Sequence, residues 1–135
     1  MTERTPLEIL MAALQAHLST YPLPQPCSIR LDLIQPQIVV QVDAAGHPAD
    51  DLAELLMWAY TLHGVTASWW HTPSGNLHVT IEGRTAAGVA FRVFAGVGYQ
   101  DTAGLVCLAT NTSQCVTLDE LRALVGRLRE LRGAA

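Results

Sequence analysis

Between Val65 and Ala95 hydrophobic and polar residues alternate in three runs, residues 65–71, 77–82 and 89–95. Alternation with a period of two is typical of strands that bury one face. Residues 72–76 and 83–88, which separate the runs, contain the glycines expected of turns. The stretch predicts a meander of three antiparallel strands. Any fold of this chain must therefore cover one face of that sheet with a hydrophobic layer.

Helical spacing appears on both sides of this stretch. The first helix begins after Thr5, because Pro6 occupies its first position and Glu8 completes a capping box. A proline-rich segment, residues 22–26, ends it. The second helix is expected at 47–63, with Gly64 as its stop, and its apolar face holds Leu52, Leu55, Leu56, Ala59 and His63. A second capping box, Thr117 with Glu120, starts the last helix.

Two further strands are expected before the second helix, and they form a hairpin. Residues 28–34 alternate, and residues 38–42 are rich in β-branched side chains. Residues 105–110 are the candidate for one more strand. The prediction is a single α+β domain over residues 1–135, with a mostly antiparallel five- or six-stranded sheet and three helices in the order α-β-β-α-β-β-β-(β)-α. This order resembles that of the roadblock family of small dimeric GTPase-associated proteins, and less closely that of polyketide-cyclase-like proteins. The resemblance is architectural and implies no function.

Composition excludes several classes of protein. The 135 residues carry a net charge of −4, which disfavours duplex nucleic acid as a partner. No apolar run is long enough to span a membrane, and the first residues do not resemble a secretory signal. Three cysteines without metal-ligand spacing fit a reducing cytoplasm. The absence of lysine, with abundant Ala and Gly, suggests a GC-rich bacterial source.

The histidines do not assemble into a catalytic or metal site. Centring the first turn of the meander on Ser74 pairs His71 with Leu77 and Trp70 with His78, so the two histidines face opposite sides of the sheet. The remaining histidines are expected at surface positions, as for His17, or in ordinary packing near a helix end. No nucleophile motif or phosphate loop is present. We therefore predict no catalytic residue, no metal and no cofactor.

A row of aromatic side chains on the sheet is a better guide to function than any of the polar residues. The same register puts Trp70, His78 and Phe94 in a row on the sheet face away from Trp69, with Arg92 beside them. Buried aromatic side chains each remove on the order of 150–250 Å² from water, so a cover for this row is expected. One of the chain's own helices, a second copy of the chain and a ligand are the three possible covers.

The leading hypothesis is a non-catalytic protein-interaction module that forms a homo-oligomer, namely a homodimer, with Trp70, His78, Arg92 and Phe94 as its interaction surface. Four leucines of the last helix have the spacing of a helix-pairing seam, although the same spacing suits packing on a sheet: Leu121, Leu124, Leu128 and Leu131. The alternative is a small-molecule-binding protein or weak enzyme, with a pocket between the helix at 47–63 and the meander. Its walls would be Trp58, Tyr60, Trp69 and His71.

Overall fold

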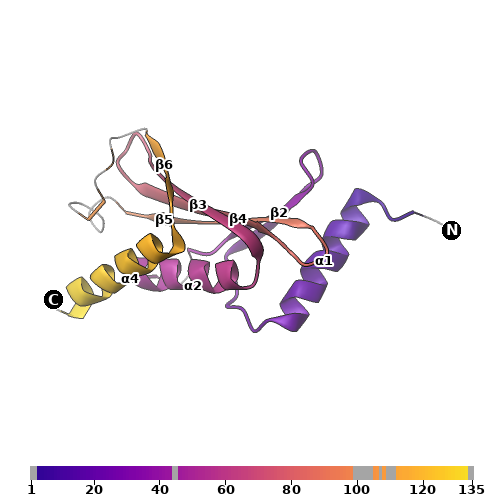
Figure 1. Cartoon of the computed structure of the whole chain (residues 1–135), viewed down its shortest axis with the longest axis horizontal. Helices are drawn as coiled ribbons and strands as arrows, with labels where there is room; N and C mark the ends of the chain where they lie inside the picture. Colours follow the sequence, from indigo (N-terminus) through magenta and orange to yellow (C-terminus); the bar gives the residue numbers. More distant parts are fainter. Residues whose placement is uncertain (1–2, 44–45, 99–104, 107, 109–111, 134–135) are drawn as a thin grey trace.

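The computed structural model describes residues 3–43, 46–98, 105, 106, 108 and 112–133. Within this part of the chain, three helices accompany one six-stranded sheet (Figure 1). The elements follow in the order α1 (Pro6–Thr20), β1 (Ser28–Asp32), β2 (Gln37–Gln41), α2 (Pro48–Tyr60), β3 (His63–His71), β4 (Leu77–Arg84), β5 (Ala90–Val97), β6 (Ser113–Val116) and α4 (Leu118–Gly133). The α+β class and the predicted order are confirmed.

The sheet has the strand order β1-β2-β5-β4-β3-β6. Its neighbouring strands are antiparallel except for β2 and β5, which run parallel. The parallel pair arises because α2 carries the chain away from β2 and the meander β3-β4-β5 then returns to it. The predicted hairpin and the predicted meander are both confirmed.

The turn between β3 and β4 sets the register of the meander. The N–H of Thr72 donates to the carbonyl of Asn76 at 2.9 Å, and Gly75 adopts a φ of 88°. Glycine reaches this left-handed region without a steric penalty. The resulting pairs, Trp70 with His78 and His71 with Leu77, are those that the alternation predicts.

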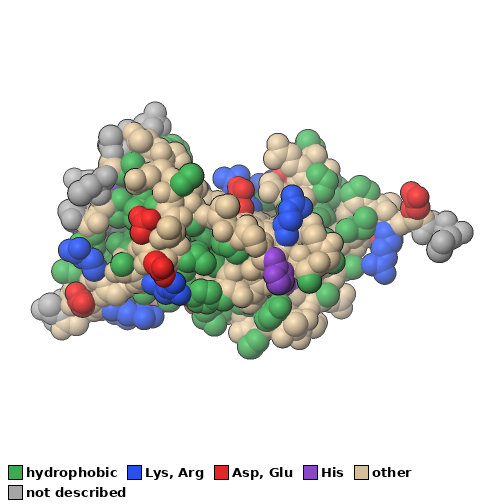
Figure 2. Space-filling view, viewed as in Figure 1, with side chains coloured by type: hydrophobic (Ala, Val, Ile, Leu, Met, Phe, Trp, Pro, Cys, Tyr) green, Lys and Arg blue, Asp and Glu red, His purple; other side chains and the backbone are tan. Residues whose placement is uncertain are grey.

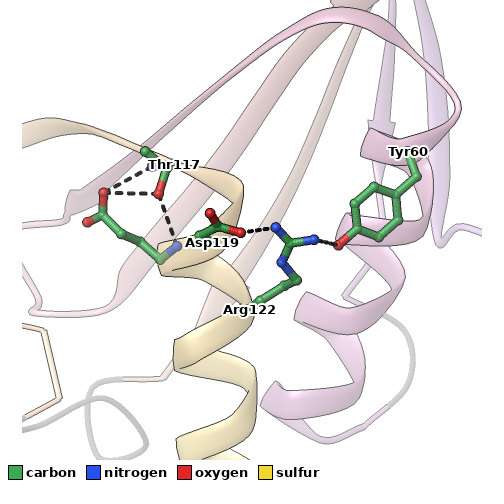
Figure 3. Close-up of polar contacts among 5 residues, drawn as sticks. Tyr60, Thr117, Asp119 and Arg122 are labelled. Atoms are coloured by element: carbon green, nitrogen blue, oxygen red, sulfur yellow. Dashed lines mark hydrogen bonds and ion pairs between the residues drawn. The ribbon is translucent and has the colours of Figure 1, made fainter.

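Both predicted threonine caps are present, and the one at α4 forms the full reciprocal box. The Glu8 N–H donates to Thr5 Oγ1 at 3.2 Å at the start of α1. At the start of α4 the Glu120 N–H donates to Thr117 Oγ1 at 3.1 Å, and the Thr117 N–H donates to the Glu120 carboxylate at 3.2 Å (Figure 3). These bonds satisfy N–H groups that have no partner inside the helix, so they fix where each helix begins.

Three boundaries differ from the prediction. The second helix ends at Tyr60 instead of residue 63, and His63 is the exposed first residue of β3. Gly64, expected as the helix stop, has a φ of 62° within this strand. The additional strand lies at Ser113–Val116, whereas Leu105, Val106 and Leu108 form a turn and a loop. The other residues of the expected strand, 107, 109 and 110, lie outside the described residues.

The core lies between the sheet and its helices. Figure 1 shows α2 and α4 together beneath the sheet, and α1 at the end nearest β1 and β2. The largest fully buried side chains include Trp58 of α2, Phe91 of β5 and Leu121 of α4. No described helix is long and apolar enough to cross a membrane.

Candidate functional site

Aromatic side chains line the sheet face that points away from α2 and α4. We call this the outer face and define it by Val39, Ser68, Trp70, His78, Thr80, Arg92 and Phe94. Successive strand residues point to opposite faces, so these seven alternate with the core residues of β2, β3, β4 and β5. In the part of the chain that the structure describes, the helices pack on the other side.

Trp70, His78 and Phe94 form a contiguous row across three strands. The rings of Trp70 and His78, which are cross-strand neighbours, have centroids 6.4 Å apart. The ring of Phe94 meets His78 edge to face, with centroids 5.0 Å apart and an interplanar angle of 82°. This T-shaped arrangement is a favoured geometry for aromatic rings. The three side chains are half-buried, so much of the row is still open for contact.

Smaller side chains fill the middle of the outer face. Val39 is 7% exposed and Thr80 is 9% exposed, although no described helix covers them. Thr80 lies opposite Phe94 on one side and Ser68 on the other, so its larger neighbour shields it. The outer face therefore combines buried small side chains with half-buried aromatic rings and the exposed Arg92.

His78 carries a polar atom that this arrangement leaves unsatisfied. Its Nε2 is buried and has no hydrogen-bond partner among the described residues. Burial lowers the pKa of His78 and the charge of Arg92 lowers it further, while the charge of Asp43 acts in the opposite direction. The ring is thus held neutral near pH 7. A buried nitrogen without a hydrogen bond costs free energy, so His78 is a strained member of the row.

Asp43 is held in place beside this row at the end of β2. Its carboxylate accepts hydrogen bonds from Gln41 Nε2 at 2.8 Å, from the Gly96 N–H at 3.3 Å and from Cys27 Sγ at 3.3 Å. Gly96 is also the residue opposite His78 in β4. The carboxylate therefore supplies a fixed negative charge at one end of the row, while Arg92 supplies a positive charge on the same face.

The leucine seam is engaged within the chain. Leu121, Leu124 and Leu128 are buried in the core, where α4 packs against α2, and only Leu131, 55% exposed, reaches the surface. Polar contacts reinforce the same packing. Arg122 of α4 pairs with Asp119, donates to the hydroxyl of Tyr60 at 2.9 Å and lies over its ring (Figure 3).

The four residues of the alternative pocket are individually engaged. Trp58 is fully buried, and Tyr60 is exposed with its hydroxyl bound to Arg122. Trp69 Nε1 donates to Gln114 at 3.1 Å, and His71 Nδ1 donates to the carbonyl of Leu108 at 2.6 Å. The space between α2 and the meander is filled by fully buried side chains, among them Leu52, Leu55, Val79, Ile81 and Val93.

A hollow of about 350 Å³ lies at another place, where the pairing of β3 with β4 is irregular. Its walls include His63, Glu82 and Arg84, all exposed, and none of the four expected pocket residues. Among the residues that the structure describes, no three His, Cys, Asp or Glu side chains are grouped so that they could hold a metal ion.

The prediction that His17 lies at the surface is wrong, because it is only 5% exposed. Its Nε2 donates to Thr61 Oγ1 at 2.8 Å, and that hydroxyl donates to the carbonyl of Trp58 at 2.7 Å. Its ring also stacks on Trp58 and packs against Phe91. The available signal was its spacing of seven residues from Leu10, which places both on the buried side of α1.

Stability is expected to fall as the pH drops below about 6.5, the ordinary pKa of histidine. Burial lowers the pKa of both His17 and His78 in the folded chain. The unfolded chain therefore binds protons first, and the stability present above this pH is lost as the pH falls towards the lowered values. The measurement is the free energy of unfolding in urea at several pH values between 7.5 and 5.5.

The variant His17→Gln isolates one histidine. Glu54 has a raised pKa, because of burial and the nearby Asp51 and Asp50, and its contribution runs in the opposite direction. The difference between the variant and the wild type in how the free energy of unfolding changes with pH is therefore more informative than the pH dependence of the wild type alone. A smaller loss of stability on acidification is expected for His17→Gln, and an unchanged pH dependence would show that His17 does not titrate in this range.

Comparison of the chain with protein-family models, with curated proteins and with solved structures finds no match.

Proposed function

We propose that this protein is a non-catalytic interaction module that self-associates and binds a protein partner through its outer face. The main support is the half-buried row of Trp70, His78 and Phe94. Within this row the His78 Nε2 has no hydrogen-bond partner among the described residues. A partner that covers this row would remove aromatic surface from water, which favours binding.

The composition of the outer face supports a protein as the partner. Aromatic residues and arginine are enriched where proteins contact one another, and they supply most of the energetically important contacts. Arg92 is exposed next to the row, and Asp43 adds the opposite charge at its end. Charges of both signs around an apolar centre favour one orientation of the partner. The net charge of −4 argues against nucleic acid.

The proposal places the protein in the cytoplasm. Cys27 and Cys115 are free thiols on the surface, and both are exposed. Exposed free thiols are more easily maintained in a reducing compartment than in an oxidising one.

Photo-crosslinking in the cells that produce the protein tests the outer face. A photoreactive phenylalanine analogue replaces Phe94, and the control carries the same analogue at Met57, which is exposed on α2 on the other side of the sheet. We expect a crosslinked protein from position 94 that position 57 does not give, and we expect Trp70→Ala to remove it. Equal products from both positions, no product at all, or a product insensitive to Trp70→Ala would each contradict the proposal.

A further inference from the structure

Helix α1 carries a stripe of apolar side chains that the rest of the described chain leaves largely uncovered. Met11 is 55% exposed and Leu7 and Leu18 are also exposed, whereas Leu14 is half-buried because one side of it packs against the core. A shallow, open hollow of about 670 Å³ lies on this side of the helix, and Met11, Leu14 and Leu18 are among its lining residues, all of which belong to α1 except Arg4. Figure 2 shows hydrophobic side chains at the surface at this end of the molecule.

The stripe differs from the side of α1 that packs on the protein. Leu10 and His17 form the buried side, whereas Leu7, Met11, Leu14 and Leu18 follow at intervals of four, three and four residues. At 100° per residue these four lie within one narrow arc of the helix. Intervals of three and four residues are typical of helices that pair along a seam.

The order of residues along this seam is symmetric about its centre. The stripe runs Leu7, Met11, Leu14, Leu18 within α1. If a second α1 lies antiparallel, Leu7 faces Leu18 of the second copy and Met11 faces Leu14. Every contact then occurs twice around a two-fold axis, which is the property of an interface between identical copies.

The charges select the antiparallel arrangement. Arg4 and Glu8 flank the N-terminal half of the stripe, and no Asp, Glu or Arg occurs from Ile9 to Tyr21. A parallel copy would bring Arg4 against Arg4 and Glu8 against Glu8. An antiparallel copy separates these like charges and brings each Arg4 to the negative C-terminal end of the other helix.

We propose that α1 is the self-association surface of this protein and that its occupant is an antiparallel α1 from a second copy. The inference rests on the self-association part of the proposed function and assigns it a place distinct from the outer face. One helix pair buries less than the roughly 800 Å² per partner of a standard interface. The dimer is therefore expected to dissociate in the micromolar range.

Sedimentation equilibrium of the whole chain, from low to high micromolar concentration, tests the inference. Met11→Glu places an uncompensated carboxylate at the centre of the seam and is expected to weaken the dimer by about tenfold or more. The matched control is Ile9→Glu, since Ile9 is also exposed on α1 but lies roughly 160° around the helix from Met11. It should dimerise as the wild type does. A monomeric wild type, or equal effects of the two variants, would overturn the inference.

A charge-pair rescue tests the orientation and does not depend on loss of association alone. Leu14→Arg should also weaken the dimer, but an equimolar mixture with Met11→Glu should regain it, because the introduced carboxylate of one chain then faces the introduced guanidinium of the other. A parallel pair would not align these two positions, so failure of the rescue in two folded variants contradicts the antiparallel seam.

Trp70→Ala separates this inference from the proposed function. It should leave the dimer unchanged while it removes the crosslink from position 94. A dimer lost in Trp70→Ala and kept in Met11→Glu would overturn the α1 seam and move self-association to the outer face. A dimer lost only in Met11→Glu, with no crosslink from position 94 in any background, would retain the seam and overturn the outer face as a binding surface.

Discussion

Trp58→Ala is expected to lower the free energy of unfolding by about 3–5 kcal/mol, a large share of the roughly 5–15 kcal/mol that stabilises a typical domain. Trp58 is fully buried, and its ring lies 6.0 Å from that of His17 and 6.3 Å from that of Phe91. It therefore joins α1, α2 and β5 at one place. Truncation leaves a cavity lined by all three elements. Urea unfolding followed by far-ultraviolet circular dichroism measures the loss.

Two further substitutions show whether the effect comes from packing. Trp58 Nε1 has no hydrogen-bond partner among the described residues, so Trp58→Phe removes no hydrogen bond and should cost clearly less than the alanine variant. Met57→Ala changes the neighbouring, exposed side chain and should stay within about 0.5 kcal/mol of the wild type. If Trp58→Ala cost no more than Met57→Ala, the described core would be wrong at its centre.

Leu121→Ala is the second large expected effect, a loss of about 2–5 kcal/mol. Leu121 is fully buried where α4 meets α2, one turn after the capping box at Thr117. Leu131 belongs to the same leucine spacing near the other end of α4 but is exposed, so Leu131→Ala should change stability by less than about 0.5 kcal/mol. The same urea titration measures both variants.

Leu121→Ala and Leu131→Ala also distinguish the two roles that the leucine spacing allows, packing within the chain and pairing with a second copy. If Leu121 packs within its own chain, Leu121→Ala loses stability at every protein concentration. Its apparent molecular mass in sedimentation should then change with protein concentration as that of the wild type does. A variant that stayed as stable as the wild type but sedimented as a monomer would instead place a second copy on α4.

Local signals in the sequence predict much of this fold. Thr5 with Glu8, and Thr117 with Glu120, mark helix starts because each pair satisfies N–H groups of a first turn. The turn at residues 72–76 and the alternation around it determine the register, since a slip of one residue would turn Val79 and Ile81 out of the core. The outer-face row follows from that register alone.

Sequence patterns identify an apolar face of a helix, but they do not specify which other element packs against that face. The spacing of Leu121, Leu124 and Leu128 suits a second copy or the chain's own α2, and only the tertiary arrangement selects α2. His17 was expected at the surface, yet Thr61, distant in sequence, supplies a hydrogen-bond partner for it in the core. In α1, the apolar spacing does not specify which residues face the core, and only the tertiary arrangement places Leu10 and His17 there while Leu7, Met11 and Leu18 are exposed.

The helix and strand boundaries were missed for a related reason. His63 continues the apolar spacing of α2, but the chain leaves the helix after Tyr60, and the C-cap residue Thr61 donates its hydroxyl to the carbonyl of Trp58. β6 is a four-residue edge strand whose first three residues are exposed, so it lacks the alternation that identifies a half-buried strand.

The most direct test of the outer face as a binding surface is the affinity of the protein captured from position 94 for the wild type and for two variants, measured by titration calorimetry. Trp70→Ala should weaken binding by about thirtyfold or more, as expected for the loss of an interface hot spot of about 2 kcal/mol. Met57→Ala, on the far side of the sheet, should leave the affinity within about twofold. Equal affinities for the wild type and Trp70→Ala would contradict the account.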